Sequence, residues 1–301
     1  MTQDLTVKTG SVRVGDIDVA YDVRGAGVPL LLVSGYTMTR AMWDPDFCAR
    51  LAERGFEVVR FDNRDTGEST RAQKLGVPHI PKAFLRSMLG LRVTPAYTLE
   101  EMANDAFGLM THLGHSRFHV VGASMGGMIA QTMAIEHPER IASLTSIMST
   151  PGGRRYSFAS VRALGALLGR VPKDRAAQVE HFVRVLTFIG GDSSPADEAR
   201  TRRLAESLVA SKPSASGSAR QFVAILDSSG RRRQHLSKVR TPTLVVHGTH
   251  DPLLPVRGAR AMTRMMPNAE LLVLDGMGHS IASFRYDSMA DAILRSSKRA
   301  S

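Results

Sequence analysis

The sequence predicts an α/β fold in which a mostly parallel central sheet carries helices on both faces and receives a helical cap insertion. Two observations lead to this prediction. Up to residue 150, short apolar runs alternate with amphipathic helical patterns, which is typical of a parallel sheet. The alternation stops at 151, and only helical periodicity follows until strands return near residue 238. We therefore divide the chain into a first core segment at 1–150, a cap at 151–237 and a second core segment at 238–301.

The first half of the sheet is predicted from four short runs. Residues 5–12 and 17–23 alternate between apolar and polar side chains, as half-buried strands do. Residues 29–33 form a continuous apolar run, which indicates a central strand buried on both faces. A helix is expected at about 44–54, and the fourth strand at 57–61.

Residues 75–97 are the least regular part of the first core segment, because three prolines surround one short helical pattern. On a helix, its apolar side chains share one face, which two basic residues flank. The apolar residues are Phe84, Leu85, Met88 and Leu89, and the basic residues are Lys82 and Arg86. The segment either packs onto the domain as a lid, which its short length favours, or lies as an interfacial helix on an anionic membrane.

A Gly-x-Ser-x-Gly pattern follows a capping box at 98–101 and the helix that this box begins. The apolar run 118–121 predicts a strand, and residues 128–134 predict a helix, with Gly122-Ala123-Ser124-Met125-Gly126 between them. A sharp turn from strand to helix strains the turn residue and exposes its side chain, and flanking glycines avoid collisions there. Ser124 is therefore the candidate nucleophile; the alternative is an ordinary glycine-rich turn.

The cap and the second core segment differ in their periodicity. Within 154–235, apolar stripes recur at helical spacing, and most of them are expected to pack helix against helix, with a minority lining a cleft. One stripe is Phe158, Val161, Leu164, Leu167 and Leu168, and another is Phe182, Val185, Leu186 and Ile189. Strands are expected at 241–248 and 271–274, with a helix at 255–266 between them.

Nucleophilic serine chemistry needs a base within hydrogen-bond reach and an acid to orient that base. Among ten histidines, His279 stands out, because it follows a buried strand and lies in a glycine-flanked loop. Asp251 follows the preceding strand. Loops after parallel strands gather at one edge of the sheet, where Ser124 also lies. The chain order Ser124, Asp251, His279 therefore predicts a catalytic triad; as an alternative, Asp251 caps a turn.

The tetrahedral intermediate of such a reaction needs backbone N–H donors. We expect one from Met125, which follows the nucleophile, and one from Tyr36 in the loop after the strand at 29–33. The alternative for this loop is a plain strand exit. The charged run at 62–65 also follows a strand, and we expect it to hold a turn rather than to act in catalysis.

Charge and cysteine content set limits on the environment. The net charge is +11, and residues 154–240 hold 17 Lys and Arg against 7 Asp and Glu, so the basic character is concentrated in the cap. This indicates either a surface for an anionic partner or solvated helix faces. The single cysteine, Cys48, excludes an intramolecular disulfide and is expected to be a buried thiol in a reducing compartment. No secretory signal and no membrane-spanning run is recognised, so we expect a cytoplasmic protein, with peripheral membrane association as an option.

The chain resembles the α/β-hydrolase superfamily over nearly its full length. Residues 60–70 are similar to the branch that contains aclacinomycin methylesterase and related esterases and lipases, and residues 242–248 and 276–279 fit the same branch. Many relatives place His-Gly at the oxyanion strand exit, where this chain has Ser34-Gly35. Relatives often continue after the catalytic histidine with Asp-Leu-Pro, where this chain has residues 280–282, Ser-Ile-Ala.

We therefore expect a serine hydrolase of carboxylic esters that works through an acyl-enzyme and needs no cofactor or metal. The apolar cap predicts a small-molecule substrate with an apolar acyl part, and the basic cap an anionic remainder, as in a phospholipid or an acyl-CoA thioester. Alternatives on the same fold are a perhydrolase, a cofactor-free haloperoxidase and a C–C bond hydrolase. A haloalkane dehalogenase is disfavoured, because Ser124 stands where an Asp nucleophile is needed.

Two alternatives lie outside enzyme chemistry. One is a non-catalytic ligand-binding protein, against which the complete triad argues. The other is nucleic-acid binding through the basic cap, centred on Arg231-Arg232-Arg233, which the lack of a nucleic-acid module disfavours. The sequence does not predict the oligomeric state.

Overall fold

The computed structural model describes residues 6–153, 155–156 and 160–300, and it confirms the predicted fold class. These residues form a sheet in the order β1-β2-β4-β3-β5-β6-β7-β8. Its strands are β1 (Val7–Val14), β2 (Ile17–Arg24), β3 (Val28–Val33), β4 (Phe56–Phe61), β5 (Phe118–Ala123), β6 (Ile141–Ile147), β7 (Thr243–Gly248) and β8 (Ala269–Leu274). The pairs β1–β2 and β2–β4 are antiparallel, and the others are parallel. The first strand was expected from residue 5, which lies outside the described residues.

The centre of the sheet is apolar on both faces, as the continuous runs predict. Every residue of β5 and β6 is buried, and so is the second half of β3. In the register of the parallel pair β3–β5, Val33 lies beside Gly122. Because β3, β5, β7 and β8 run in the same direction, the loops that follow them meet at one edge of the sheet.

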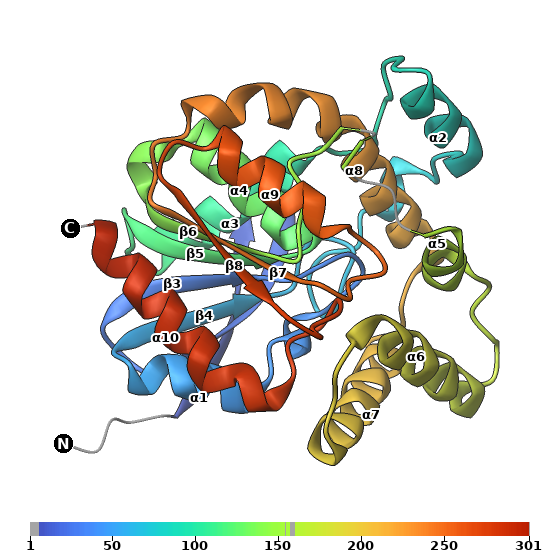
Figure 1. Ribbon diagram of the computed structural model, residues 1–301. Coiled ribbons are helices and arrows are strands. Elements are labelled where there is room, and N and C mark those ends of the chain that lie inside the picture. Colours follow the sequence, from blue (N-terminus) through green and yellow to red (C-terminus); the bar gives the residue numbers. More distant parts are fainter. Residues whose placement is uncertain (1–5, 154, 157–159, 301) are drawn as a thin grey trace.

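Helices cover both faces of the sheet (Figure 1). Helices α3 (Leu99–His112), α4 (Met125–Glu136) and α9 (Val256–Met265) bury their apolar sides in one core cluster, and α1 (Pro45–Glu53) and α10 (Tyr286–Ser297) bury theirs in another. The predicted capping box begins α3: the Thr98 hydroxyl accepts a hydrogen bond from Glu101 N, and the Glu101 carboxylate accepts one from Thr98 N. Cys48 lies buried in α1, and burial raises the pKa of its thiol to about 12.

The described residues between β6 and β7 hold four α-helices, and Figure 1 shows the first three of them beyond the carboxyl ends of the strands. They are α5 (Val161–Leu168), α6 (Arg175–Gly190), α7 (Pro195–Ala210) and α8 (Ala215–His235). Of the first predicted apolar stripe, Phe158 and the side chains at 161, 164, 167 and 168 lie outside what is described. Helix α8 returns from the cap to the core and packs on both α3 and α4.

The arginine triplet at 231–233 does not form one basic surface. Arg232 is buried and donates to Gln131 Oε1 at 3.0 Å and to Thr150 O at 3.2 Å. Burial lowers the pKa of Arg232 to about 10. Arg231 is exposed but paired with Asp227 at 2.6 Å. Arg232 therefore joins α8 to the core, so the triplet is not the continuous basic surface that the nucleic-acid alternative assumed.

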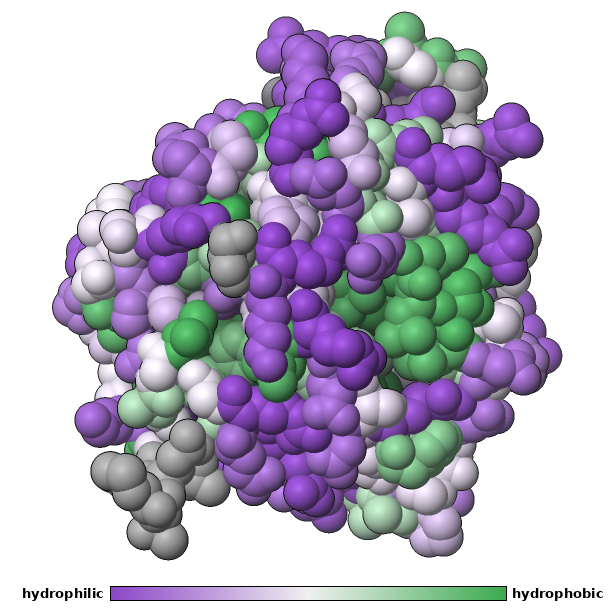
Figure 2. All heavy atoms as spheres, turned by 60° about the vertical axis from the view of Figure 1, so that its left-hand side comes forward, coloured by the Kyte–Doolittle hydropathy of each residue, from purple (hydrophilic) through white to green (hydrophobic). Residues whose placement is uncertain are grey.

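The irregular segment packs onto the domain, which was the favoured interpretation. Helix α2 (Ile80–Met88) lies against α8 through a small cluster of Ala83, Val93 and Val223. Among the described residues, no helix is both long and apolar enough to cross a bilayer. The face of the molecule in Figure 2 is mostly hydrophilic, and the hydrophobic side chains there gather in patches, the largest on the right of the view.

Candidate active site

Ser124 stands alone between the last residue of β5 and the first residue of α4. Its backbone has φ 56° and ψ −119°, a strained conformation that costs roughly 1–3 kcal/mol and that the surrounding structure must enforce. A Cβ added to Gly122 would lie 2.1 Å from Gly126 O, and one added to Gly126 would lie 2.0 Å from Val33 O. Both glycines are therefore required for this turn, as the motif predicts.

His279 and Asp251 lie on the loops that follow β8 and β7, and the structure brings them together. His279 Nδ1 is 2.7 Å from Asp251 Oδ2. The other carboxylate oxygen, Oδ1, accepts hydrogen bonds from Leu253 N at 2.8 Å and Leu254 N at 2.9 Å. Asp251 therefore caps a turn and contacts His279 at the same time, so the two interpretations from the sequence are compatible.

Two opposing effects act on the pKa of Asp251. Its side chain is fully buried, which by itself would raise the pKa. The neighbouring imidazoles of His279 and His247 outweigh that burial, and they hold the pKa of this carboxyl well below its usual range. Asp251 is thus an anion at neutral pH, placed to stabilise positive charge on His279.

Ser124 and His279 line the same cavity, whose volume is about 100 Å³. Its apolar walls come from the core and from the cap. They include Met42, Trp43, Phe47, Met148, Leu186, Ile189, Leu204 and Leu253. Leu186 and Ile189 belong to the second predicted stripe, so part of that stripe lines the cleft, as expected for a cap.

The loop at 34–39, which we call the β3 loop, forms another wall through Gly35 and Tyr36. Helix α8 holds this loop: Thr37 N donates to Gln221 Oε1 at 2.9 Å, and Gln221 Nε2 donates to Arg64 O at 2.9 Å. The centres of the Tyr36 and Phe222 rings are 6.1 Å apart, and burial raises the pKa of the Tyr36 hydroxyl. Sequence patterns do not indicate a role for Gln221, because its partners lie more than 150 residues away.

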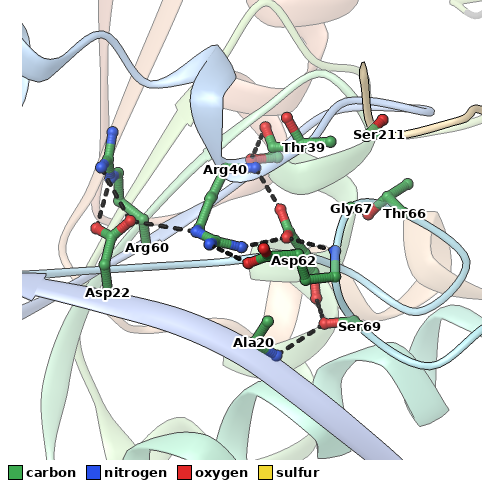
Figure 3. A network of polar contacts seen from close by, with 12 residues as sticks. Ala20, Asp22, Thr39, Arg40, Arg60, Asp62, Thr66, Gly67, Ser69 and Ser211 are labelled. Carbon is green, nitrogen blue, oxygen red and sulfur yellow. Dashed lines mark hydrogen bonds and ion pairs between the residues drawn. The ribbon is translucent and has the colours of Figure 1, made fainter. Parts of the chain in front are cut away.

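A network of charges fixes the other end of the β3 loop (Figure 3). Arg40 N donates to Asp62 Oδ1 at 2.6 Å, and the Arg40 guanidinium pairs with Asp62 and with Asp22, the latter at 3.2 Å. Arg60 also binds Asp22, at 2.8 Å. The run at 62–65 thus holds turns together, as the sequence predicted.

The remaining charges of that run are paired across the fold. Arg64 Nε donates to Asp105 Oδ2 at 2.7 Å. Asp65 receives two hydrogen bonds from Arg220 of α8, at 2.7 and 2.8 Å, and both side chains are fully buried. This ion pair joins the cap helix to the strand exit beside the site.

A second cleft, with a volume of about 550 Å³, lies between the β3 loop and α7. Several charged residues line it, including Arg40, Asp44 and Glu68. Arg200 lines both clefts, and its Nη2 donates to Ile281 O at 3.0 Å. Sequence reasoning did not single out Arg200, because an arginine close to Arg202 and Arg203 on a polar helix resembles a solvated residue. Within the described part of the chain, no group of three His, Cys, Asp or Glu is placed to hold a metal.

Comparison with known proteins gives concordant matches. The family model described as alpha/beta hydrolase fold matches residues 28–286. Rhodomycin D methylesterase DnrP of Streptomyces peucetius is 28% identical over 291 residues, which cover 89% of this chain and 90% of the relative. The esterase EaEST of Exiguobacterium antarcticum has a similar structure, with a TM-score of 0.74, 20% identity, and coverage of 97% of this chain and 100% of that one. A membrane phospholipase A, described as a bacterial virulence factor, has a TM-score of 0.69 at 23% identity, with coverage of 97% and 87%.

Proposed function

The chain belongs to the alpha/beta hydrolase family, and we propose that it is a serine hydrolase of carboxylic esters. One observation carries the proposal: Ser124 and His279 line one largely apolar cavity, while buried Asp251 binds the other nitrogen of the imidazole. The strained backbone of Ser124 supports the same assignment. The match to a methylesterase over most of both chains favours ester hydrolysis among the chemistries of this fold.

In the proposed mechanism, His279 Nε2 takes the proton of Ser124 Oγ as this oxygen attacks the acyl carbonyl carbon. The N–H groups of Tyr36 and Met125 hold the resulting oxyanion. Collapse of the intermediate breaks the bond to the alcohol, which leaves with the proton from His279. Water, deprotonated by His279, then attacks the acyl-enzyme, releases the acid and restores Ser124. Asp251 stabilises the imidazolium in both halves, and no cofactor takes part.

Replacement of Ser124 tests this proposal. Ser124→Ala should lose turnover of p-nitrophenyl butyrate and lose covalent labelling by a fluorophosphonate probe. Ser288→Ala, an exposed serine on α10, is the matched control and should behave as wild type. Full activity in Ser124→Ala would refute the assignment of the nucleophile. An unlabelled wild-type protein without turnover would favour the non-catalytic binding alternative.

The two clefts suggest how a substrate is divided. We propose that the apolar cavity takes the acyl part, and that the cleft beyond Arg200, with its charged lining residues, takes the remainder of the molecule. A phospholipid or an acyl-CoA thioester has this division. A hydrolysis profile across acyl chain lengths, including both classes, tests it. The proposal requires faster turnover of an apolar acyl chain than of a carboxylate-tipped chain of equal length; the reverse order would contradict it.

A further inference from the structure

The outward side of α2 and its flanking loops carries an unusual amount of apolar surface. Five of the nine large hydrophobic side chains that are exposed among the described residues lie within residues 75–91. They are Leu75, Val77, Leu85, Leu89 and Leu91, with exposed fractions of 48–69%. We call the outward side of residues 75–91 the α2 surface. Single exposed apolar residues are ordinary, but a concentration in one short segment marks an interaction site.

The α2 surface belongs to a folded and anchored element. The inward side of α2 packs on α8 through Ala83, and Figure 1 shows the helix at the outer limit of the molecule, beyond α8. Arg220 Nη1 donates to Gly76 O at 2.7 Å, and Arg86 Nε donates to Arg92 O at 2.7 Å. These bonds fix the loops before and after the helix, so the leucines are held outward by the fold.

The positive charge of this segment indicates the chemistry of its partner. Residues 71–92 contain five basic residues and no acidic residue. On the helix, Leu85 and Leu89 are one turn apart, and Lys82 and Arg86 are one turn apart on the adjoining exposed strip. An apolar strip beside a basic strip is the pattern of an element that lies in the interface of an anionic bilayer. A second copy of the chain is a poor partner, since a twofold contact would place these like charges together.

We propose that the α2 surface docks the protein on anionic lipid membranes, with Leu85 and Leu89 entering the headgroup region and Lys82 facing lipid phosphates. The contact does not depend on the proposed hydrolase activity. It also has a structural route to the site: Val223 of α8 packs against α2, whereas the preceding residues Gln221 and Phe222 contact the β3 loop. A docked α2 therefore sits one helix away from the proposed oxyanion donor.

Vesicle sedimentation of the full chain tests the proposal. Vesicles of phosphatidylcholine alone are compared with vesicles that also contain phosphatidylglycerol. Wild type should bind the anionic vesicles roughly tenfold more tightly, and added salt should weaken that binding. Leu85→Ser/Leu89→Ser and Lys82→Glu should each lose at least about fivefold of the affinity. Equal binding to both vesicle types, or unchanged binding by these variants, would overturn the proposal.

Controls separate docking from folding and from catalysis. Phe284→Ser removes an equally exposed hydrophobic residue outside the α2 surface and should keep wild-type binding. The α2 variants should keep wild-type circular dichroism and turnover of a soluble ester. Ser124→Ala should bind vesicles as wild type does, so failure of the hydrolase proposal leaves this result intact. A dimer that only the α2 variants dissociate would assign the surface to self-association instead.

Discussion

Replacing Asp251 by asparagine should invert the hydrogen bonding of His279. Asp251 Oδ1 accepts the N–H groups of Leu253 and Leu254, whereas Oδ2 faces His279 Nδ1. In Asp251→Asn, the amide oxygen should take the Oδ1 position, because the two N–H groups need an acceptor. The amide NH₂ then faces His279 Nδ1 and donates to it. Neutral His279 is forced to carry its proton on Nε2, the nitrogen that must accept the proton of Ser124.

The size of the effect follows from this tautomer. A histidine protonated on Nε2 cannot act as the base, and the corresponding change in serine proteases costs about 10⁴ in kcat. That is about 5.5 kcal/mol of lost transition-state stabilisation. Asp251 is absent from the described cavity wall, so KM should change by no more than roughly threefold. The variant should also fold, because its oxygen keeps the turn that Oδ1 closes.

The assay is steady-state hydrolysis of p-nitrophenyl butyrate by wild type and Asp251→Asn over about pH 5 to 9, the range in which histidine titrates. Asp275→Asn, an exposed acid just after β8, is the matched control and should keep the wild-type kcat. A kcat for Asp251→Asn within about tenfold of wild type would refute the reasoning, because the residue would then not set the tautomer of His279.

Three further predictions concern stability. Arg220→Met leaves the carboxylate of Asp65 buried without its cation and should lower the free energy of unfolding by about 3–5 kcal/mol in urea titration; a loss below about 1 kcal/mol would contradict the structural role. Gly126→Ala should abolish soluble folded protein, as judged by circular dichroism, since its Cβ would meet Val33 O; a folded variant would show that the turn can shift. The pKa of Asp251 is lower in the folded protein than in the unfolded chain, so the ionised carboxylate stabilises the fold. This contribution is fully present above the unfolded pKa of about 3.9 and is lost as the pH falls toward the folded pKa. The melting temperature of wild type should therefore fall more steeply below about pH 4 than that of Asp251→Asn. Parallel decreases in the two melting temperatures would contradict this prediction.

The fold and the positions of the site residues could be predicted because they depend on local patterns. Apolar runs mark strands, and the alternation with helices makes those strands parallel. Parallel strands then bring the loops after them to one edge, so Ser124, Asp251 and His279 could be placed together without any knowledge of side-chain contacts. The strained turn at Ser124 likewise has a five-residue signature.

The contacts of α8 could not be predicted, because they join residues that are far apart in the chain. Gln221 and Arg220 lie on a helix whose periodicity shows only that it packs somewhere. Arg232 looked like part of a basic surface, yet it lies in the interior beside Gln131. Charge clusters in sequence do not reveal which cations the fold buries, and α8 buries two of them, Arg220 and Arg232.

These long-range contacts explain how the β3 loop can differ in sequence from many relatives. Its backbone and that of the adjoining Arg40 are held from three sides: Gln221 binds Thr37 N, Asp62 binds Arg40 N, and Asn63 Nδ2 donates to Ser34 O at 3.1 Å. Ser34 lies buried and donates to Thr39 O at 3.2 Å, which closes the loop on itself. The proposed oxyanion donor is a main-chain group, so its position depends on these bonds rather than on the side chain at 34. A serine where relatives carry histidine is therefore compatible with the proposed chemistry.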